Sequence, residues 1–125
     1  MFSAFFYALK GRGIPVTPTA YLRLHQAMNH GLILSMDDFY SVARAILVKS
    51  ERYFDLYDRV FSHHFKGTDL DEMDDTDLDD LTRELLRDWL KNPKDVADAL
   101  GVSEEQLRAM TPDEVLQYFL DRLKD

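Results

Sequence analysis

The residues with the clearest chemical potential are the carboxylates of an acidic run at 69–80. Eight of these residues are Asp or Glu and none is basic. Asp75, Asp77 and Asp79 have the spacing of the first three ligands of an EF-hand calcium loop. That loop also needs a glycine at its sixth position and a glutamate at its twelfth, whereas this sequence has Asp80 and a leucine there. We therefore predict no metal site and interpret the run as a solvated linker that leads into a helix N-terminus, where negative charge is favourable.

A second candidate is the segment GRGIPVTP at residues 11–18, because glycine-rich loops can cradle phosphate. The segment has neither the Walker spacing nor three spaced glycines after a strand, and its two prolines lack amide donors. We interpret it instead as an elbow between two helices. Gly11 or Gly13 is then expected to adopt a positive φ, and Ile14 and Val16 are expected to pack on the core.

Four histidines are the remaining side chains that could bind a metal or act as a base. His63 and His64 are adjacent, so they diverge by about 100° on a helix. His25 and His30 are five residues apart and miss the usual i, i+4 spacing. The sequence has no cysteine and no Gly-x-Ser-x-Gly elbow, which excludes thiolate chemistry and disulfides. We therefore expect a non-enzymatic, cytoplasmic protein without metal or cofactor, in which His64 has a packing role.

The elements that position these groups are predicted to be helices throughout. Apolar residues recur at i, i+3, i+4 and i+7 in most segments, and no strong alternating strand pattern occurs. We therefore predict an all-α fold, a single domain of about seven helices in an irregular bundle. Helix starts are indicated by N-cap residues, often followed by proline. In chain order these signals are Thr17-Pro18, Ser35 with Asp38, Ser50, Thr76 or Asp77, Asn92-Pro93, Ser103 with Gln106, and Thr111-Pro112 with Glu114.

Charge divides the sequence into two parts. Residues 1–67 hold eight Lys or Arg and five Asp or Glu, a net charge of +3, whereas residues 68–125 hold seven and eighteen, a net charge of −11. We predict aromatic-rich N-terminal helices at 1–67 and acidic C-terminal helices at 68–125, packed together as one domain. Such an acidic chain lacks the clustered cations that nucleic acids require. No apolar run approaches the ~20 residues of a membrane span.

Basic residues lie among the aromatic residues of the N-terminal part. Arg44, Lys49, Arg52 and Arg59 are interspersed with Phe and Tyr, and aromatic residues are enriched at protein interfaces. Each of these cations taken singly also fits the solvated back of a helix. We predict these four residues as partner-binding residues.

The N-terminal part resembles the N-terminal region of bacterial CoxE-like proteins, which contain a von Willebrand factor A domain. The resemblance spans FFYALKGRGIPVTPTAYLRLHQAM and LSMDDFYSVARAILVKSERYFDLYDRVFSHHFKG and is strongest over 36–65. The segment before the A domain in that group is also similar to LTRELLRDWLKNPKDVADAL and SEEQLRAMTPDEVLQYFLDRLKD of this sequence. The matching residues are Gly13-Ile14-Pro15-Val16, Asp38-Phe39-Tyr40, Ala43-Arg44-Ala45, Leu47-Val48-Lys49, and Phe54-Asp55 with Asp58.

The resemblance implies a helical module rather than an A domain. CoxE-like proteins continue into a Rossmann-like domain whose DxSxS motif binds a metal ion, and this sequence has no DxSxS. The metal site therefore does not carry over. We expect either the N-terminal module of a longer protein or a short stand-alone relative.

The resemblance also suggests a functional class. CoxE-like proteins are associated with MoxR-type AAA+ ATPases in the maturation or assembly of metal-containing enzymes. The resemblance therefore implies that this chain is a non-catalytic interaction module that binds such an ATPase or its client. The strongly acidic C-terminal part supports an alternative, a stand-alone acidic regulator that binds a basic protein partner and whose binding collapses with salt.

Overall fold

The computed structural model describes residues 2–69 and 78–124, which fold as helices joined by short connections. Eight α-helices and one short 3-10 turn are present in these residues, and no strand. The prediction of an all-α fold is confirmed, with one helix more than the approximate count expected from the sequence. The elements are α1 Phe2–Gly11, α2 Pro18–Asn29, α3 Met36–Leu47, η1 Glu51–Tyr53, α4 Phe54–Phe65, α5 Leu78–Trp89, α6 Pro93–Leu100, α7 Glu104–Arg108 and α8 Pro112–Leu123.

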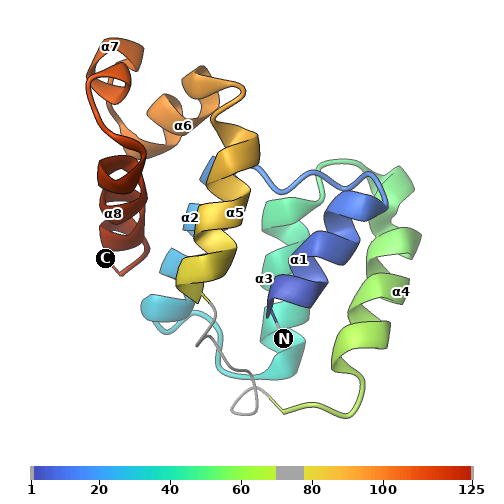
Figure 1. The fold of residues 1–125 in the computed structure, drawn as a ribbon. Coiled ribbons are helices and arrows are strands. Elements are labelled where there is room, and N and C mark those ends of the chain that lie inside the picture. The colour runs from blue at the N-terminus through green and yellow to red at the C-terminus, as the bar shows by residue number, and fades with distance from the viewer. Residues whose placement is uncertain (1, 70–77, 125) are drawn as a thin grey trace.

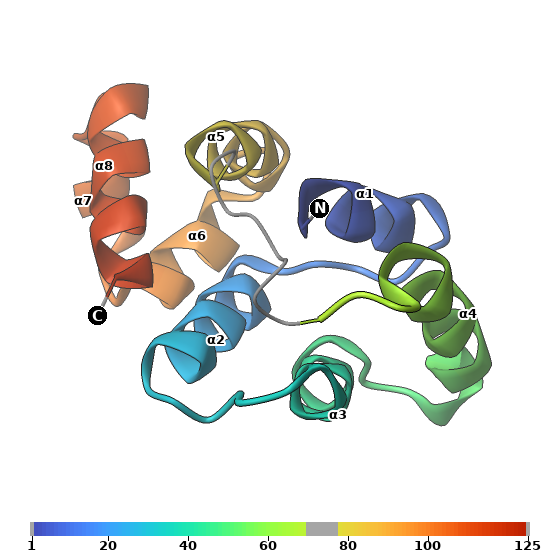
Figure 2. The same cartoon turned by 90° about the horizontal axis from the view of Figure 1, so that it is seen from below.

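Helix α2 is the central element of the bundle. It contacts α3 on one side and α6 and α8 on the other. Helices α1, α3 and α4 form one group beside it, and α5 to α8 form a second group (Figures 1 and 2). The two groups correspond to the basic and acidic parts of the sequence, but the division at 67/68 stays a prediction. Buried apolar side chains from all eight α-helices belong to a single core cluster.

Local capping signals set most of the helix starts. The Thr17 hydroxyl accepts a hydrogen bond from the Ala20 amide at 3.2 Å, with Pro18 at the first helical position. Ser103 with Gln106 and Thr111 with Glu114 form complete capping boxes. In the second box the Thr111 amide donates to the Glu114 carboxylate at 3.1 Å, which lowers the pKa of Glu114. These three predicted starts are confirmed because the signals are local and need no tertiary contact.

Three predicted starts differ in detail, among them Asn92-Pro93, where α6 begins at Pro93 without a side-chain cap bond from Asn92, and one lies outside the described residues. Ser35 caps α3 as expected, but the Asp38 carboxylate accepts from the Leu34 amide at 3.0 Å rather than from the cap residue. Ser50 precedes the 3-10 turn η1 without a side-chain cap, so α4 begins only at Phe54. The predicted start at Thr76 or Asp77 falls outside the described residues.

Aromatic rings fill the space between α1, α3 and α4. The Phe5 ring lies 4.9 Å from Phe65 and 5.8 Å from Phe61, centroid to centroid, in edge-on geometry. Phe39 and Tyr57 complete the cluster at 6.3 Å and 6.1 Å. Phe5, Phe39 and Tyr57 have no exposed surface. Edge-to-face contacts of this kind add to the free energy gained by burial, so the cluster fixes α4 against α1.

A second aromatic group joins the two helix groups through α2. The Tyr21 ring lies 5.4 Å from Phe6 on α1 and 5.5 Å from Trp89 on α5. The buried Tyr21 hydroxyl is 3.0 Å from the Thr82 hydroxyl, a hydrogen bond between α2 and α5. This polar pair is satisfied inside the core, which avoids the cost of burying an unpaired hydroxyl.

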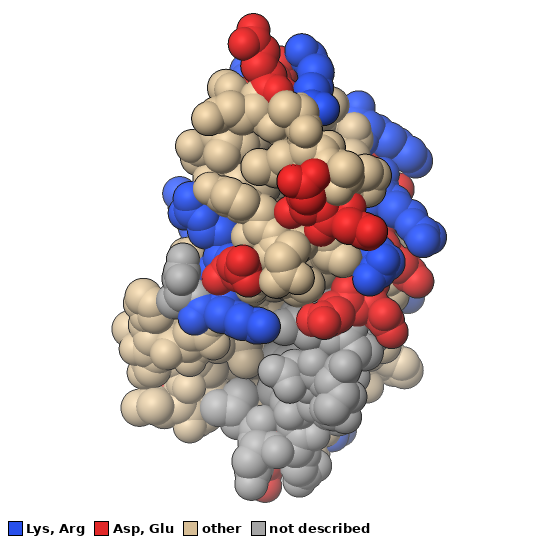
Figure 3. Space-filling view, turned by 60° about the vertical axis from the view of Figure 1, so that its left-hand side comes forward, with Lys and Arg blue, Asp and Glu red and all other residues tan. Residues whose placement is uncertain are grey.

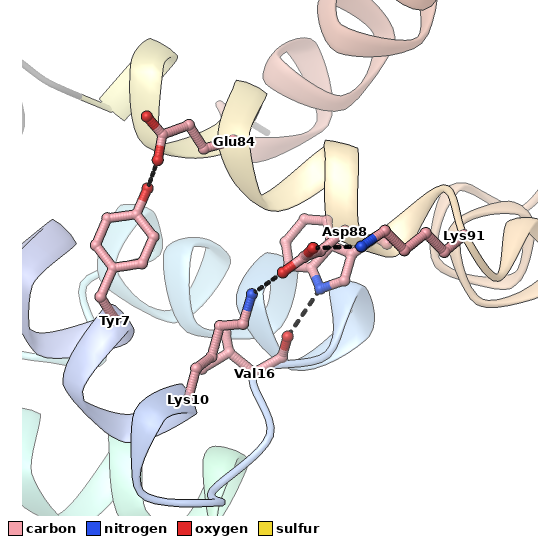
Figure 4. Close-up of polar contacts among 7 residues, drawn as sticks. Tyr7, Lys10, Val16, Glu84, Asp88 and Lys91 are labelled. Carbon is pink, nitrogen blue, oxygen red and sulfur yellow. Dashed lines mark hydrogen bonds and ion pairs between the residues drawn. The ribbon is translucent and has the colours of Figure 1, made fainter.

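Polar contacts between α1 and α5 reinforce the same junction (Figure 4). The Tyr7 hydroxyl donates to Glu84, and Lys10 pairs with Asp88, which also lies 3.4 Å from Lys91. The two lysines, Lys10 foremost, lower the pKa of the exposed Asp88 carboxyl. Such exposed pairs contribute little free energy, so we assign them a role in orientation rather than in stability.

The GRGIPVTP segment is the elbow that the sequence predicts. Its amides are used internally: Gly13 N–H donates to the Lys10 carbonyl at 3.1 Å and Ile14 N–H to the Leu9 carbonyl at 2.9 Å. Gly13 has φ +88°, and Ile14 and Val16 are buried. The Val16 carbonyl accepts a hydrogen bond from the Trp89 indole at 2.8 Å (Figure 4). The elbow therefore has a structural role, and it leaves the side chain of Arg12 exposed beside α4.

Candidate functional site: a basic cavity between α1 and α4

A cavity of about 480 Å³ opens between the end of α1 and the outer side of α4. Two arginines and two histidines supply its polar side chains, and no carboxylate lines it within the described residues. A hollow of this composition suits an anion, since guanidinium and imidazole groups donate hydrogen bonds to carboxylate or phosphate oxygens. The lining residues are Ala8, Arg12, Arg59, Val60, His63 and His64.

The helical period of α4 explains why these side chains converge. Tyr57, Phe61 and Phe65 face the core. Residues midway between these core positions point outward, and Arg59 and His63, four residues apart, share one exposed face. Arg12 reaches the same cavity from the elbow that ends α1. The site thus depends on the aromatic cluster for its α4 wall and on the elbow for its α1 wall.

The positive charge of the cavity is not neutralised within the part of the chain that the structure describes. No ion pair there involves Arg12 or Arg59, and both side chains are exposed. His64 is half-buried, and its ring lies 6.2 Å from Phe5 and 5.1 Å from His63. Burial, followed by the adjacent His63, lowers the pKa of His64. At neutral pH the two guanidinium groups therefore carry the charge, and His64 contributes a neutral ring.

The lowered pKa of His64 predicts a pH dependence of stability. In the unfolded chain the imidazole of His64 has its ordinary pKa of about 6.5, so it binds a proton more readily than in the folded protein. The contribution of His64 to stability is therefore complete above about pH 6.5. It is lost as the pH falls from there through the lower pKa of the folded state. We expect the free energy of unfolding to fall more between about pH 8 and about pH 5.5 in the wild type than in His64→Gln. Urea titrations at both pH values measure this difference. Lys124→Gln, at an exposed position and with a side chain that does not titrate in this pH range, is the control and should follow the wild type; equal slopes for all three proteins would contradict the prediction.

A second, shallower hollow of about 480 Å³ continues along α4. It shares Arg59 and His63 with the cavity and is extended by Ser62 and Lys66. Asp55 and Asp58 form its opposite end. Together the cavity and this hollow form a continuous strip, which we call the basic trough.

Asp58 is tied to the neighbouring helix α3. Its carboxylate accepts a hydrogen bond from the Tyr40 hydroxyl, which raises the pKa of Tyr40. Burial likewise raises the pKa of Tyr57, whose hydroxyl donates to the Tyr40 carbonyl at 2.9 Å. The Tyr40 hydrogen bond holds Asp58 against α3, whereas the cations of the trough face solvent.

The four predicted partner-binding residues do not share one cavity. Arg44 is half-buried and stacks on the Phe54 ring at 4.4 Å, with a hydrogen bond to the Tyr40 hydroxyl at 3.3 Å. Arg52 lies over the Tyr53 ring at 4.7 Å and donates to its hydroxyl at 2.8 Å. Cation–π contacts of this kind are intramolecular packing and tie both side chains to the α3–α4 connection.

Lys49 and Arg59 line separate hollows. Lys49 borders one beside α2 together with Arg23, whereas Arg59 belongs to the basic trough. Arg12 was missed as a binding residue because its approach to Arg59 depends on how α1 packs on α4, and His63 was missed although it lies on the same helix as Arg59. The i, i+4 spacing of Arg59 and His63 was the one local signal for a shared face.

The described residues contain neither a cluster of potential metal ligands nor a membrane-spanning helix. Within 2–69 and 78–124, no three His, Asp or Glu side chains are grouped closely enough to hold a metal ion. Asp75 and Asp77 of the rejected calcium loop fall outside these residues, and Asp79 is exposed in the first turn of α5. No helix in the described ranges has the length and apolarity needed to cross a membrane.

Comparison with known proteins identifies a relationship for the N-terminal helices. A family model described as the CoxE N-terminal helical bundle domain matches residues 2–68. The matched stretch contains α1 to α4 and every residue of the basic trough. Neither a curated protein nor a solved structure shows significant similarity to the chain.

Proposed function

Because the chain belongs to the family of CoxE N-terminal helical bundle domains, we propose that it is a non-catalytic protein-interaction module. In this proposal it works in the cytoplasm with a MoxR-type AAA+ ATPase in the maturation or assembly of a metalloenzyme. Family membership supports the association with CoxE-like proteins. The ATPase partner and its client are the part of the proposal that goes beyond family membership. The interaction uses the exposed cations of the N-terminal helices.

The basic trough is the observation that carries the interaction role. Its cations are exposed, lack ion-pair partners in the described chain, and lie on helices that the family match includes. A rigid aromatic cluster holds these helices in place, so the side chains are presented on a preformed surface.

A binding measurement tests the proposal. The purified chain is titrated against its cognate MoxR-type ATPase by biolayer interferometry, with ATP turnover of the ATPase followed in parallel. We expect saturable binding by the wild type and a loss of at least about tenfold in affinity for Arg59→Glu/Lys66→Glu, which reverses two exposed cations of the trough, since rim charges steer and orient association. Lys94→Glu/Lys124→Glu carries the same charge change on exposed residues of the C-terminal helices and should bind as the wild type does. Absence of binding, or equal losses in both double variants, would count against the proposal.

The alternative acidic regulator is a second outcome of the same experiment. On the face shown in Figure 3, acidic and basic side chains lie side by side. Within the C-terminal helices charges also pair locally, as in Arg108 with Glu104 at 3.6 Å. Such mixed charge does not make the uniform anionic face that a polyanion mimic presents. Binding that survives substitution of the basic residues in the trough, but that about 0.5 M salt abolishes, would favour the regulator instead.

A further inference from the structure

We propose that the basic trough is a binding site for an acidic peptide segment, in which Asp or Glu side chains of the partner pair with Arg12 and Arg59. The inference rests on the proposed function, because the acidic segment belongs to the protein partner of that function. It goes beyond that function by naming the site and the chemistry of the ligand.

Charge and donor geometry favour carboxylates as the groups bound. Arg12 and Arg59 come from different elements and line one cavity, so two guanidinium forks are available to the same ligand. His63 adds a further exposed ring nitrogen donor or acceptor between them and Lys66. A guanidinium donates two parallel hydrogen bonds to a carboxylate, and such charge-assisted hydrogen bonds are stronger than neutral ones.

Shape favours a chain segment over a single small ion. The cavity and the adjoining hollow each have a volume of about 480 Å³ and share Arg59 and His63. The cations are therefore spread along α4 from Arg59 to Lys66, which spans about two helical turns or roughly 10 Å. An extended peptide of three or four residues covers this length at about 3.3 Å per residue, whereas one phosphate ion reaches only part of the strip.

The acidic end of the trough sets the direction of the ligand. Asp55 and Asp58 line the hollow but not the cavity that contains Arg12. A carboxylate placed beside them is repelled, so the acidic side chains of the ligand lie in the cavity with Arg12 and Arg59 and beside Lys66. Asp58 is also engaged by the Tyr40 hydroxyl, which fixes its position.

A peptide titration that contains no ATPase tests the site alone. The full chain, labelled with ¹⁵N, is titrated with acetyl-tetraglutamate amide, with the tetraglutamine peptide, and separately with inorganic phosphate. We expect the glutamate peptide to shift the amide signals of residues at 8–14 and 59–66, and its affinity to fall severalfold between about 0.05 M and about 0.5 M NaCl. The glutamine peptide should not bind.

Two double variants complete the test. Arg12→Ala/Arg59→Ala should lower the affinity for the glutamate peptide by at least about tenfold, which equals about 1.4 kcal/mol of binding free energy. Lys94→Ala/Lys124→Ala, with the same loss of charge at exposed positions outside the trough, should leave the affinity unchanged. Equal binding by both variants, or phosphate binding as tight as the peptide, would overturn the inference. Circular dichroism confirms that each variant is folded.

The peptide and ATPase experiments fail independently. Normal peptide binding without ATPase binding would contradict the proposed function and leave the trough assigned. ATPase binding that is insensitive to Arg12→Ala/Arg59→Ala, with no peptide binding, would overturn the trough as the site and leave the interaction role intact.

Discussion

Phe5→Ala is expected to lower the free energy of unfolding by about 3–5 kcal/mol, because it leaves a cavity at the centre of the aromatic cluster. The ring has no exposed surface and contacts Phe61 and Phe65 edge-on at 5.8 Å and 4.9 Å. At roughly 4 °C per kcal/mol for a domain of this size, the melting temperature should fall by on the order of 10–20 °C. Urea denaturation followed by circular dichroism measures the change.

The controls for Phe5 separate ring packing from hydrophobicity alone. Phe5→Leu keeps most of the buried volume and should cost less than Phe5→Ala. Leu34→Ala changes an apolar residue that is 79% exposed and should stay within about 0.5 kcal/mol of the wild type. A loss below about 1 kcal/mol for Phe5→Ala would contradict the aromatic cluster as the element that fixes α4 against α1.

Trp89→Ala is expected to lower the free energy of unfolding by about 3–5 kcal/mol, because this ring joins the elbow, α2 and α8. It packs on Tyr21 at 5.5 Å and on Phe119 at 5.4 Å, and its indole N–H donates to the Val16 carbonyl at 2.8 Å. Trp89→Phe keeps an aromatic ring but leaves the buried carbonyl without this donor, at a cost of about 1–3 kcal/mol.

Trp89 is the single tryptophan of the chain, so its variants are followed by circular dichroism rather than by fluorescence. Tyr7→Phe is the matched control, since it removes a partly exposed hydroxyl that contacts Glu84 on the same helix. Tyr7→Phe should lower the free energy of unfolding by less than Trp89→Phe does. Equal losses would show that the α1–α5 surface contacts matter as much as the buried junction. Independent unfolding of the two helix groups in the wild type would contradict the junction itself.

Much of the fold was predictable because its start signals are local. The capping boxes at Ser103 and Thr111 and the Thr17-Pro18 start use only neighbouring residues, and each is confirmed by its hydrogen bond. The elbow was predictable for the same reason, since Gly13 alone can adopt its φ of +88° without strain. Ser50 fails as a helix cap because it precedes a 3-10 turn and makes no side-chain bond to it.

The site was much less predictable, because it depends on tertiary packing. Arg59 was identified from its place among aromatic residues, but its cavity exists only where α1 packs on α4 and brings Arg12 beside it. Arg44 has the same local pattern, yet its guanidinium stacks on Phe54 at 4.4 Å. Sequence spacing indicates which residues share a helix face, but not which face the neighbouring helix leaves open.

The most direct test of the interaction role is hydrogen–deuterium exchange of the full chain with and without its cognate MoxR-type ATPase. Binding at the basic trough predicts slower amide exchange in peptides that cover residues 8–14 and 59–66, around Arg12, Arg59 and His63. Exchange in α7 and α8 should not change. Protection confined to α7 and α8, or no protection at saturating ATPase, would contradict the account.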